Sequence, residues 1–248
     1  MKKLLVIILL LYTGCYSFAQ PTAGTTGLLN CPSAEMPLDG TFTAGANYLP
    51  DNVTHQPKFN YNTFNYYVGM AFLPFMELSF RMILFRDPDN GSLRNQDRSL
   101  ALRVRVLNER KFLPSVVIGG NDVYTTSSSG NQYFRSLYIA CTKTFSIDGY
   151  LTGVSLGYAP GNLTNSNIYG LFGGISFSPA FFRSFTIIAD YDTKYLDAGA
   201  SLLLFRHFYL YGFASDLKQF AGGIAFKLYP KGTRTEASFL SSPHSDTD

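Results

Sequence analysis

The residues of this sequence that could carry out catalysis are few and widely spaced. The histidines are His55, His207 and His244, which fall in a loop, a turn and the C-terminal tail, and none has a serine at suitable spacing within a strand. Nucleophilic catalysis needs a base and a hydroxyl within hydrogen-bond reach of each other. We therefore expect no catalytic residues and no enzymatic activity.

Metal and cofactor sites are not expected either. Asp87, Asp89 and Asn90 form an acidic turn that could hold calcium, but the later glutamate of a full calcium loop is missing, so a plain turn is the alternative. Cys31 and Cys141 lie far apart and lack the paired spacing of zinc sites; a disulfide between them remains open. The chain has no phosphate-cradling glycine loop and no dinucleotide fingerprint.

Charged residues instead alternate with apolar residues in extended segments. Arg103 and Arg105 alternate with Leu102 and Val104, for example, and this period of two predicts strands with one oily and one wet face. The charged residues expected on wet faces are Glu77, Arg81, Arg103, Arg105, Asp190, Asp192 and Lys227. If the oily faces meet lipid, these side chains point into a lumen, because a basic group facing lipid at mid-membrane costs about 2–4 kcal/mol. They would form a binding wall for an acidic or hydroxyl-rich glycan, or pair with one another and fill a narrow barrel.

The elements that must position these residues are about twelve strands. We expect them at 41–48, 64–72, 77–84, 99–106, 115–123, 133–145, 149–158, 170–177, 184–192, 197–204, 208–214 and 221–229. After the leader no segment approaches the roughly 18 apolar residues of a membrane helix. Aromatic residues cluster at strand ends, as in the two girdles of a membrane barrel.

The connections favour a membrane barrel over a soluble β-sandwich, which is the alternative. Polar stretches at 49–61, 86–97, 124–132 and 159–169 alternate with tight turns near Pro74, 108–114, 146–149, 178–183 and 206–207. Outer-membrane barrels combine long external loops with short periplasmic turns in this way. The predicted fold class is all-β: a transmembrane antiparallel up-and-down β-barrel of about twelve strands.

The two ends of the chain predict export and a tail. Lys2 and Lys3 precede an apolar run at 4–11, and Ser17 and Ala19 suit signal peptidase, so residues 1–19 are expected to be a signal peptide. Lipid modification of Cys15 is the alternative. Residues 20–40 form an N-terminal segment, 41–229 the barrel, and 230–248 a disordered periplasmic tail. The net charge of only +3 disfavours a nucleic-acid surface.

A distinctive run, G-L-L-x-x-P-S-A-x-M-x-x-D-G, leads into the first strand. It comprises Gly27, Leu28, Leu29, Pro32, Ser33, Ala34, Met36, Asp39 and Gly40. Pro32 and Pro37 stiffen it, and Asp39 with Gly40 suits a tight turn. The segment would serve as a plug or lid, or as a plain anchor crossing the periplasmic mouth of the barrel; we favour the anchor.

This run resembles the opening of YjbH-like proteins. Further matches follow in the family's order: Asp97, Arg98 and the strand to Val106, then Arg110, Leu113, Pro114, Val117, Gly119 and Asp122, and later Ala189, Asp190, Tyr191 and Asp192. Asp190 stands where a glutamate would match the family better. The chain looks like a short, one-barrel version of these proteins.

The resemblance implies an outer-membrane β-barrel of a Gram-negative bacterium, associated with exopolysaccharide export or assembly, with no catalytic residues to carry over. Its expected partners are outer-membrane lipid, polysaccharide and other envelope export proteins. A small-solute porin and an outer-membrane lipid or glycan hydrolase remain alternatives.

Overall fold

The computed structural model describes residues 22–54, 60–87, 89–122, 134–161 and 168–229. The expected signal peptide, the alternative lipidation at Cys15 and the expected tail lie outside the described residues, as do His55 and His244.

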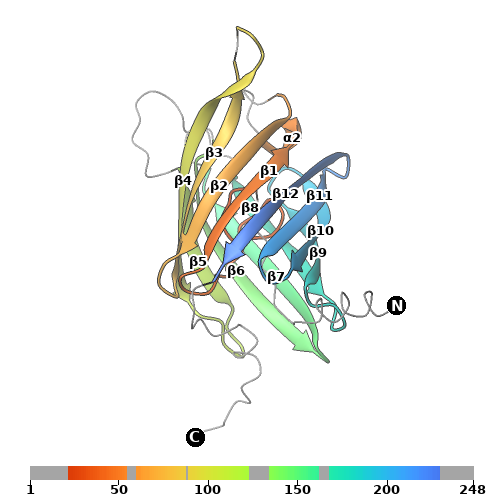
Figure 1. Ribbon diagram of the computed structural model, residues 1–248. Coiled ribbons are helices and arrows are strands. Elements are labelled where there is room, and N and C mark those ends of the chain that lie inside the picture. The colour runs from red at the N-terminus through yellow and green to blue at the C-terminus, as the bar shows by residue number, and fades with distance from the viewer. Residues whose placement is uncertain (1–21, 55–59, 88, 123–133, 162–167, 230–248) are drawn as a thin grey trace, which may run out of the picture.

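Twelve antiparallel strands form one closed sheet (Figure 1). They are β1 (Phe42–Leu49), β2 (Thr63–Ala71), β3 (Met76–Arg86), β4 (Leu93–Leu107), β5 (Ser115–Asn121), β6 (Ser136–Ile147), β7 (Tyr150–Ala159), β8 (Gly170–Ser178), β9 (Phe185–Tyr191), β10 (Leu196–Leu204), β11 (Phe208–Ser215) and β12 (Gln219–Leu228). Each strand pairs with the next one in the chain, and β1 pairs with β12, so the sheet has no free edge. The predicted twelve-stranded up-and-down barrel is confirmed, and the sandwich alternative is wrong.

Helical structure is minor in the described residues. One short helix, α2 (Asp51–Thr54), lies between β1 and β2. No helix in the described part of the chain is long and apolar enough to cross a membrane.

The barrel has its apolar face outside and its polar face inside. Large apolar side chains point outward and are widely exposed, including Ile118 at 46%, Leu156 at 56% and Leu171 at 65%. Their neighbours along the strands point inward and are buried, and many of them are polar, such as Asn65 and Ser99. An apolar surface of this extent is stable only against an apolar solvent, so the barrel is of the transmembrane type.

The two ends of the barrel differ in their connections. One end, here the turn end, holds the starts of odd strands, the ends of even strands and the tight turns predicted from the sequence, such as the two-residue turn of Asp148 and Gly149 between β6 and β7. Both of these residues have positive φ, as the favoured hairpin turns require. The opposite end, the loop end, carries the remaining connections.

The β3–β4 hairpin differs from the prediction. A loop was expected over 86–97, but β4 already begins at Leu93, and Ile83 pairs with Asp97 in register with the rest of the ladder. The start of β4 is rich in polar residues, so the apolar alternation typical of a membrane-facing strand is missing there. Backbone hydrogen bonds between strands do not depend on that alternation, and the pairing continues. The hairpin therefore rises above its neighbours at the loop end (Figure 1).

Inward-facing aromatic rings lie against glycines on neighbouring strands. Gly45 is the register partner of Tyr67, and a Cβ added to Gly45 would lie 2.5 Å from the Tyr67 hydroxyl oxygen. Gly157 is likewise opposite Phe172, whose ring occupies the space above it. These glycines allow large rings to lie flat on the wall and leave room in the lumen.

Glycines that meet backbone rather than a ring give a direct test of the wall's packing. A Cβ at Gly199 on β10 would overlap the Gly212 carbonyl oxygen of β11, whereas one at Gly69 on β2 would have its nearest neighbour at 3.4 Å. We expect Gly199→Ala to lower the free energy of unfolding by about 1–3 kcal/mol, as for other overpacked sites. The measurement is a urea titration in which the folded barrel is separated from the unfolded chain by gel electrophoresis of unheated samples. Gly69→Ala is the matched control. Equal stability of the two variants would contradict this description of the packing.

Candidate functional site: a lumen filled by the N-terminal segment

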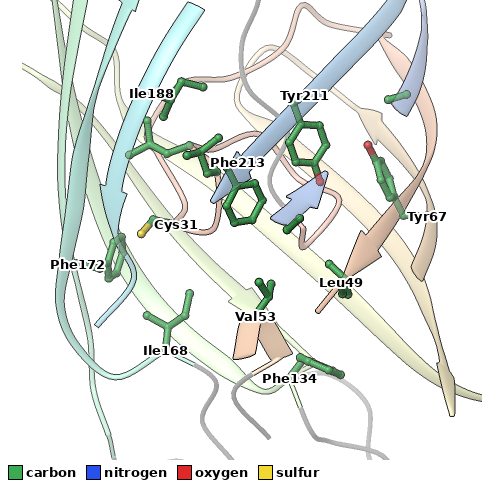
Figure 2. Packing of buried hydrophobic residues seen from close by; sticks show 14 of the residues in the cluster. Cys31, Leu49, Val53, Tyr67, Phe134, Ile168, Phe172, Ile188, Tyr211 and Phe213 are labelled. Atoms are coloured by element: carbon green, nitrogen blue, oxygen red, sulfur yellow. The ribbon is translucent and has the colours of Figure 1, made fainter. Parts of the chain in front are cut away.

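Most of the N-terminal segment, residues 22–40, lies inside the barrel, while Asp39 and Gly40 at its end are exposed. Leu28, Leu29 and Cys31 are buried in one hydrophobic cluster with inward-facing wall residues such as Phe172 and Phe213. Figure 2 shows Cys31 within this cluster, surrounded by side chains of the wall. The sequence favours an anchor across the mouth of the barrel, but the segment instead reaches deep into the lumen, because the wall supplies partners for its backbone there.

The innermost part of the segment is a tight turn, here called the tip, at residues 28–31. The Leu28 amide donates a hydrogen bond to the Cys31 carbonyl oxygen at 2.8 Å, and Gly27 and Pro32 form an isolated β-bridge beside it. A turn of this kind points successive backbone N–H groups in one direction, as in anion-binding nests.

The Asp190 carboxylate on β9 accepts these N–H groups. Its Oδ2 atom accepts hydrogen bonds from the amides of Leu29, Asn30 and Cys31 at 3.0, 3.0 and 3.1 Å. The Asn30 side chain extends the contact by donating from Nδ2 to Asp192 Oδ2 at 2.6 Å. Hydrogen bonds to a charged acceptor contribute about 1.5–3 kcal/mol each. Asp190 is therefore the strongest single attachment of the tip.

The wall behind Asp190 is shaped to hold it. Gly174 on β8 is its register partner, and a Cβ there would overlap the β9 backbone beside Asp190. The Cys31 thiol donates to the Tyr191 carbonyl oxygen at 3.2 Å, which ties the same turn to β9. Cys31 and Cys141 are free cysteines, so the disulfide alternative is wrong.

A second attachment is the ion pair between Arg103 and Glu77. Arg103 Nη1 lies 3.3 Å from Glu77 Oε2, and both side chains are almost completely buried. Arg103 Nη2 donates to the carbonyl oxygens of Ser33 and Glu35 at 2.6 and 2.8 Å, while Glu77 Oε1 accepts from the Thr26 amide at 2.9 Å. The pair thus binds both limbs of the segment, on either side of the tip.

Other wall residues hold the ends of the described segment. Asn65 Nδ2 and Arg81 Nη1 both donate to the Thr22 carbonyl oxygen, at 2.7 and 3.4 Å. The Ala34 amide donates to Thr142 Oγ1 at 2.7 Å. Arg81 also lies 4.5 Å from the centre of the Phe134 ring, in cation–π geometry.

The remaining two predicted wall residues lie nearer the turn end. Arg105 is half-buried and donates to the Pro74 carbonyl oxygen in the β2–β3 turn. Lys227 on β12 is buried, with its ammonium group 4.7 Å from the centre of the Tyr209 ring.

The opening motif divides into a buried part and a turn. Ala34 and Met36 pack with Val117 of β5 in a small apolar cluster. The Thr41 amide donates to the Leu38 carbonyl oxygen at 3.0 Å and closes a turn with Gly40 at φ 76°, so the predicted turn at Asp39 and Gly40 is confirmed. A side chain at position 40 would strain this turn.

Several residues of the site were not singled out from the sequence. Asn30, Asn65 and Thr142 bind the segment, but a lone amide or hydroxyl carries no signal until its partner is known. Asp197 and Asp97, both completely buried, sit at inward positions of β10 and β4. For Asp197, the alternation of its strand would have been sufficient, whereas Asp97, noted in the sequence only as a family match, lies where polar residues interrupt the alternation.

A small cavity lies beside the tip. A cavity of about 20 Å³ lies between the segment and the wall, with Thr22, Thr25 and Asn30 on one side and Arg81 and Asn121 on the other. A cavity of this size admits roughly one or two water molecules.

The described residues show little catalytic or metal-binding chemistry. His207 lies in the β10–β11 turn, with Nδ1 2.7 Å from the Lys227 carbonyl oxygen. In the described part of the chain, no group of three or more histidine, cysteine, aspartate or glutamate side chains could hold a metal ion. At the acidic turn, Asp87 Oδ1 accepts the Asp89 amide at 2.9 Å, which is ordinary turn geometry.

The fold and this site define a class: a transmembrane twelve-stranded β-barrel whose lumen is occupied by its own N-terminal segment. Residues 19–201 match the model of the YjbH family, described as exopolysaccharide biosynthesis protein YbjH. The chain belongs to this family, as the resemblance of its opening motif implied.

The comparisons with individual proteins are more distant. The "Uncharacterized lipoprotein YjbH" of Escherichia coli (strain K12) is 24% identical over 185 residues, which is 66% of this chain and 24% of that protein. The chain thus spans about a quarter of the length of this relative. Among solved structures, the KdgM porin (TM-score 0.46, 10% identity) covers 76% of this chain and 99% of its own, and Escherichia coli outer membrane phospholipase A (0.37, 13%) covers 79% and 98%.

Removal of the Asp190 carboxylate should loosen the tip. In Asp190→Ala the three amides lose a charged acceptor, and the loss of even one such bond corresponds to about a tenfold change in an equilibrium. We expect maleimide labelling of the buried Cys31 thiol to accelerate by at least about tenfold, as measured by mass spectrometry of the Cys31 peptide. The exposed Asp39→Ala is the control. An unchanged labelling rate in a correctly folded Asp190→Ala barrel would show that this contact does not hold the tip.

Glu35 should make the stability of the plugged barrel depend on pH. Burial raises the pKa of its carboxyl to about 7, against the opposing effects of the Ser33 hydrogen bond and the positive charge of Arg103; Glu109 and Lys227 also act on it. Because this pKa is raised, Glu35 keeps its proton to a higher pH in the folded state than in the unfolded chain. The contribution of Glu35 to stability is therefore greatest at low pH and falls as pH rises from about 4.5 to about 7.

The measurement is the urea midpoint at about pH 5 and about pH 8. The wild type should lose stability between the two, and Glu35→Gln, which cannot ionise, should lose clearly less. If both proteins respond to pH equally, Glu35 is not the responsible group.

Proposed function

We propose that this chain is an outer-membrane barrel that takes part in exopolysaccharide export or assembly, without catalysis of its own, and that residues 22–40 act as its plug. The observation that carries the proposal is the occupied lumen of a member of an exopolysaccharide family. Some of the charged wall residues, for which a glycan-binding wall and mutual pairing were the two interpretations, are engaged with the segment, most directly Asp190 and Arg103. This supports a lumen that is closed at rest.

The connections support one orientation in the membrane. Because the number of strands is even, β1 begins and β12 ends at the turn end. In single-chain bacterial barrels this end faces the periplasm. We therefore assign the turn end to the periplasm and the loop end to the outside. The acidic residues Asp190 and Asp192 then lie near the outer end of the lumen.

A general small-solute porin is a weaker alternative. A porin keeps a water-filled channel, whereas the described lumen holds the chain's own N-terminal segment, with Leu28, Leu29 and Cys31 buried against the wall. A small solute would have to displace the segment, together with its buried ion-pair contacts and those to Asp190. Passive diffusion through this resting state is therefore not expected.

A hydrolase on lipid or glycan would need a general base beside a nucleophile. Of the described residues, His207 is the one histidine, and its ring lies against Phe226 at 5.7 Å and bonds to backbone in a turn. This is the environment of a structural histidine. The proposal therefore assigns no reaction to the barrel itself.

Deletion of the gene tests the proposal. We expect loss of surface polysaccharide with the envelope otherwise intact, as shown by unchanged resistance to detergent, and restoration by the wild-type gene. Liposomes containing the purified protein should not swell in small sugars, because the lumen is closed. Unchanged polysaccharide after deletion would contradict the export role, and rapid swelling would favour a porin.

A further inference from the structure

The buried charged side chains of the barrel are unequal in sign. Among the described residues, the buried acidic side chains outnumber the buried basic ones by six to three. They are Glu77, Asp97, Asp122, Asp190, Asp192 and Asp197 against Arg81, Arg103 and Lys227. Once hydrated and ionised, these groups would give the lumen wall an excess of three negative charges.

This excess is concentrated on one side. Arg103 pairs with Glu77, and the charge of Arg81 acts on Asp97 and Asp122, so acids and bases are mixed on β3–β5. Asp190, Asp192 and Asp197 form a separate group on β9 and β10 and the turn between them, here called the acid wall. Asp190 and Asp197 are direct register partners. Lys194, exposed in the same turn, acts on Asp192 and offsets part of this charge.

The acid wall already binds N–H donors. Three backbone amides of the tip donate to Asp190, and the side-chain amide of Asn30 donates to Asp192. The buried polar atoms at this wall without a hydrogen-bond partner include Asp190 Oδ1 and the Oγ of Ser215, which lies opposite Asp197 on β11. The wall therefore recognises N–H groups and has acceptor capacity beyond what the tip uses.

We propose that the acid wall is a binding surface for the amino groups of a cationic, amino-sugar-containing glycan, which competes with the tip for Asp190 and Asp192. This inference rests on the proposed function and names the class of glycan. An ammonium group offers the same N–H donors as the tip together with a positive charge, and such charge-assisted bonds are about twice as strong as neutral ones. A glycan rich in carboxylates would be repelled by the same three aspartates.

Competition with the tip can be measured on the intact protein. The Cys31 thiol is buried in the tip, so its labelling by a maleimide reports how often the tip leaves the wall. We would compare three hexasaccharides in the same neutral buffer: oligoglucosamine, whose amino groups are then partly protonated, its N-acetylated form, and oligogalacturonate. Calcium chloride alone tests for simple cation binding.

Oligoglucosamine should accelerate Cys31 labelling by about fivefold or more, which is the range of ordinary coupling between competing ligands. The neutral and acidic hexamers and calcium should have little effect. Asp197→Asn retains an acceptor oxygen but removes one charge of the wall, so it should reduce the acceleration. Asp122→Asn makes the same change on β3–β5's side of the barrel and should leave the acceleration unchanged.

Three outcomes would overturn the inference: no acceleration by oligoglucosamine, equal acceleration by oligogalacturonate or calcium, or equal responses of the two variants. The proposed function is judged separately, by surface polysaccharide after gene deletion. Accelerated labelling with unchanged polysaccharide would retain the wall's selectivity and reject the export role. Loss of polysaccharide without accelerated labelling would support the export role and reject the selectivity proposed for the acid wall.

Discussion

The structure depends on the contact between one buried carboxylate and three consecutive backbone amides. A segment without regular secondary structure can remain inside a barrel only if its N–H and C=O groups find partners, because each buried polar group left without one costs about 1–3 kcal/mol. Asp190 provides three of these partners at the tip, and Arg103 provides two more for the carbonyl oxygens of residues 33 and 35. The charged residues of the lumen thus compensate for the irregular backbone that they surround.

This arrangement explains why a barrel with its apolar face outside and its polar face inside tolerates so much buried charge. An isolated buried ion is costly, but Arg103 and Glu77 form a pair, and each also binds the segment. Glycines such as Gly45, Gly157 and Gly174 thin the wall where a ring or a carboxylate must lie close to it. The lumen is therefore a packed core made of a wall and an inserted chain, rather than a pore lined by free charges.

The barrel was predictable from the sequence because its signals are local. Alternation of apolar and polar residues predicted the strands, and polar stretches between them predicted most connections, except where polar residues continued the β3–β4 hairpin to Leu93. The turn at Asp39 and Gly40 was predictable for the same reason. The course of residues 22–38 was not, because it is decided by contacts with strands far along the chain, such as that between Cys31 and Asp190, which are 159 residues apart. The sequence indicated which charges face inward but not that the chain's own amides satisfy them.

Hydrogen exchange at the tip tests the central claim most directly. If residues 28–31 lie in the lumen on Asp190, their amides should exchange as slowly as those of the neighbouring strands β9 and β10 in the folded, detergent-solubilised protein. Mass spectrometry of a peptide spanning the tip would show this protection. Exchange of these amides at the rate of an unstructured peptide, while the strands remain protected, would mean that the segment does not occupy the barrel.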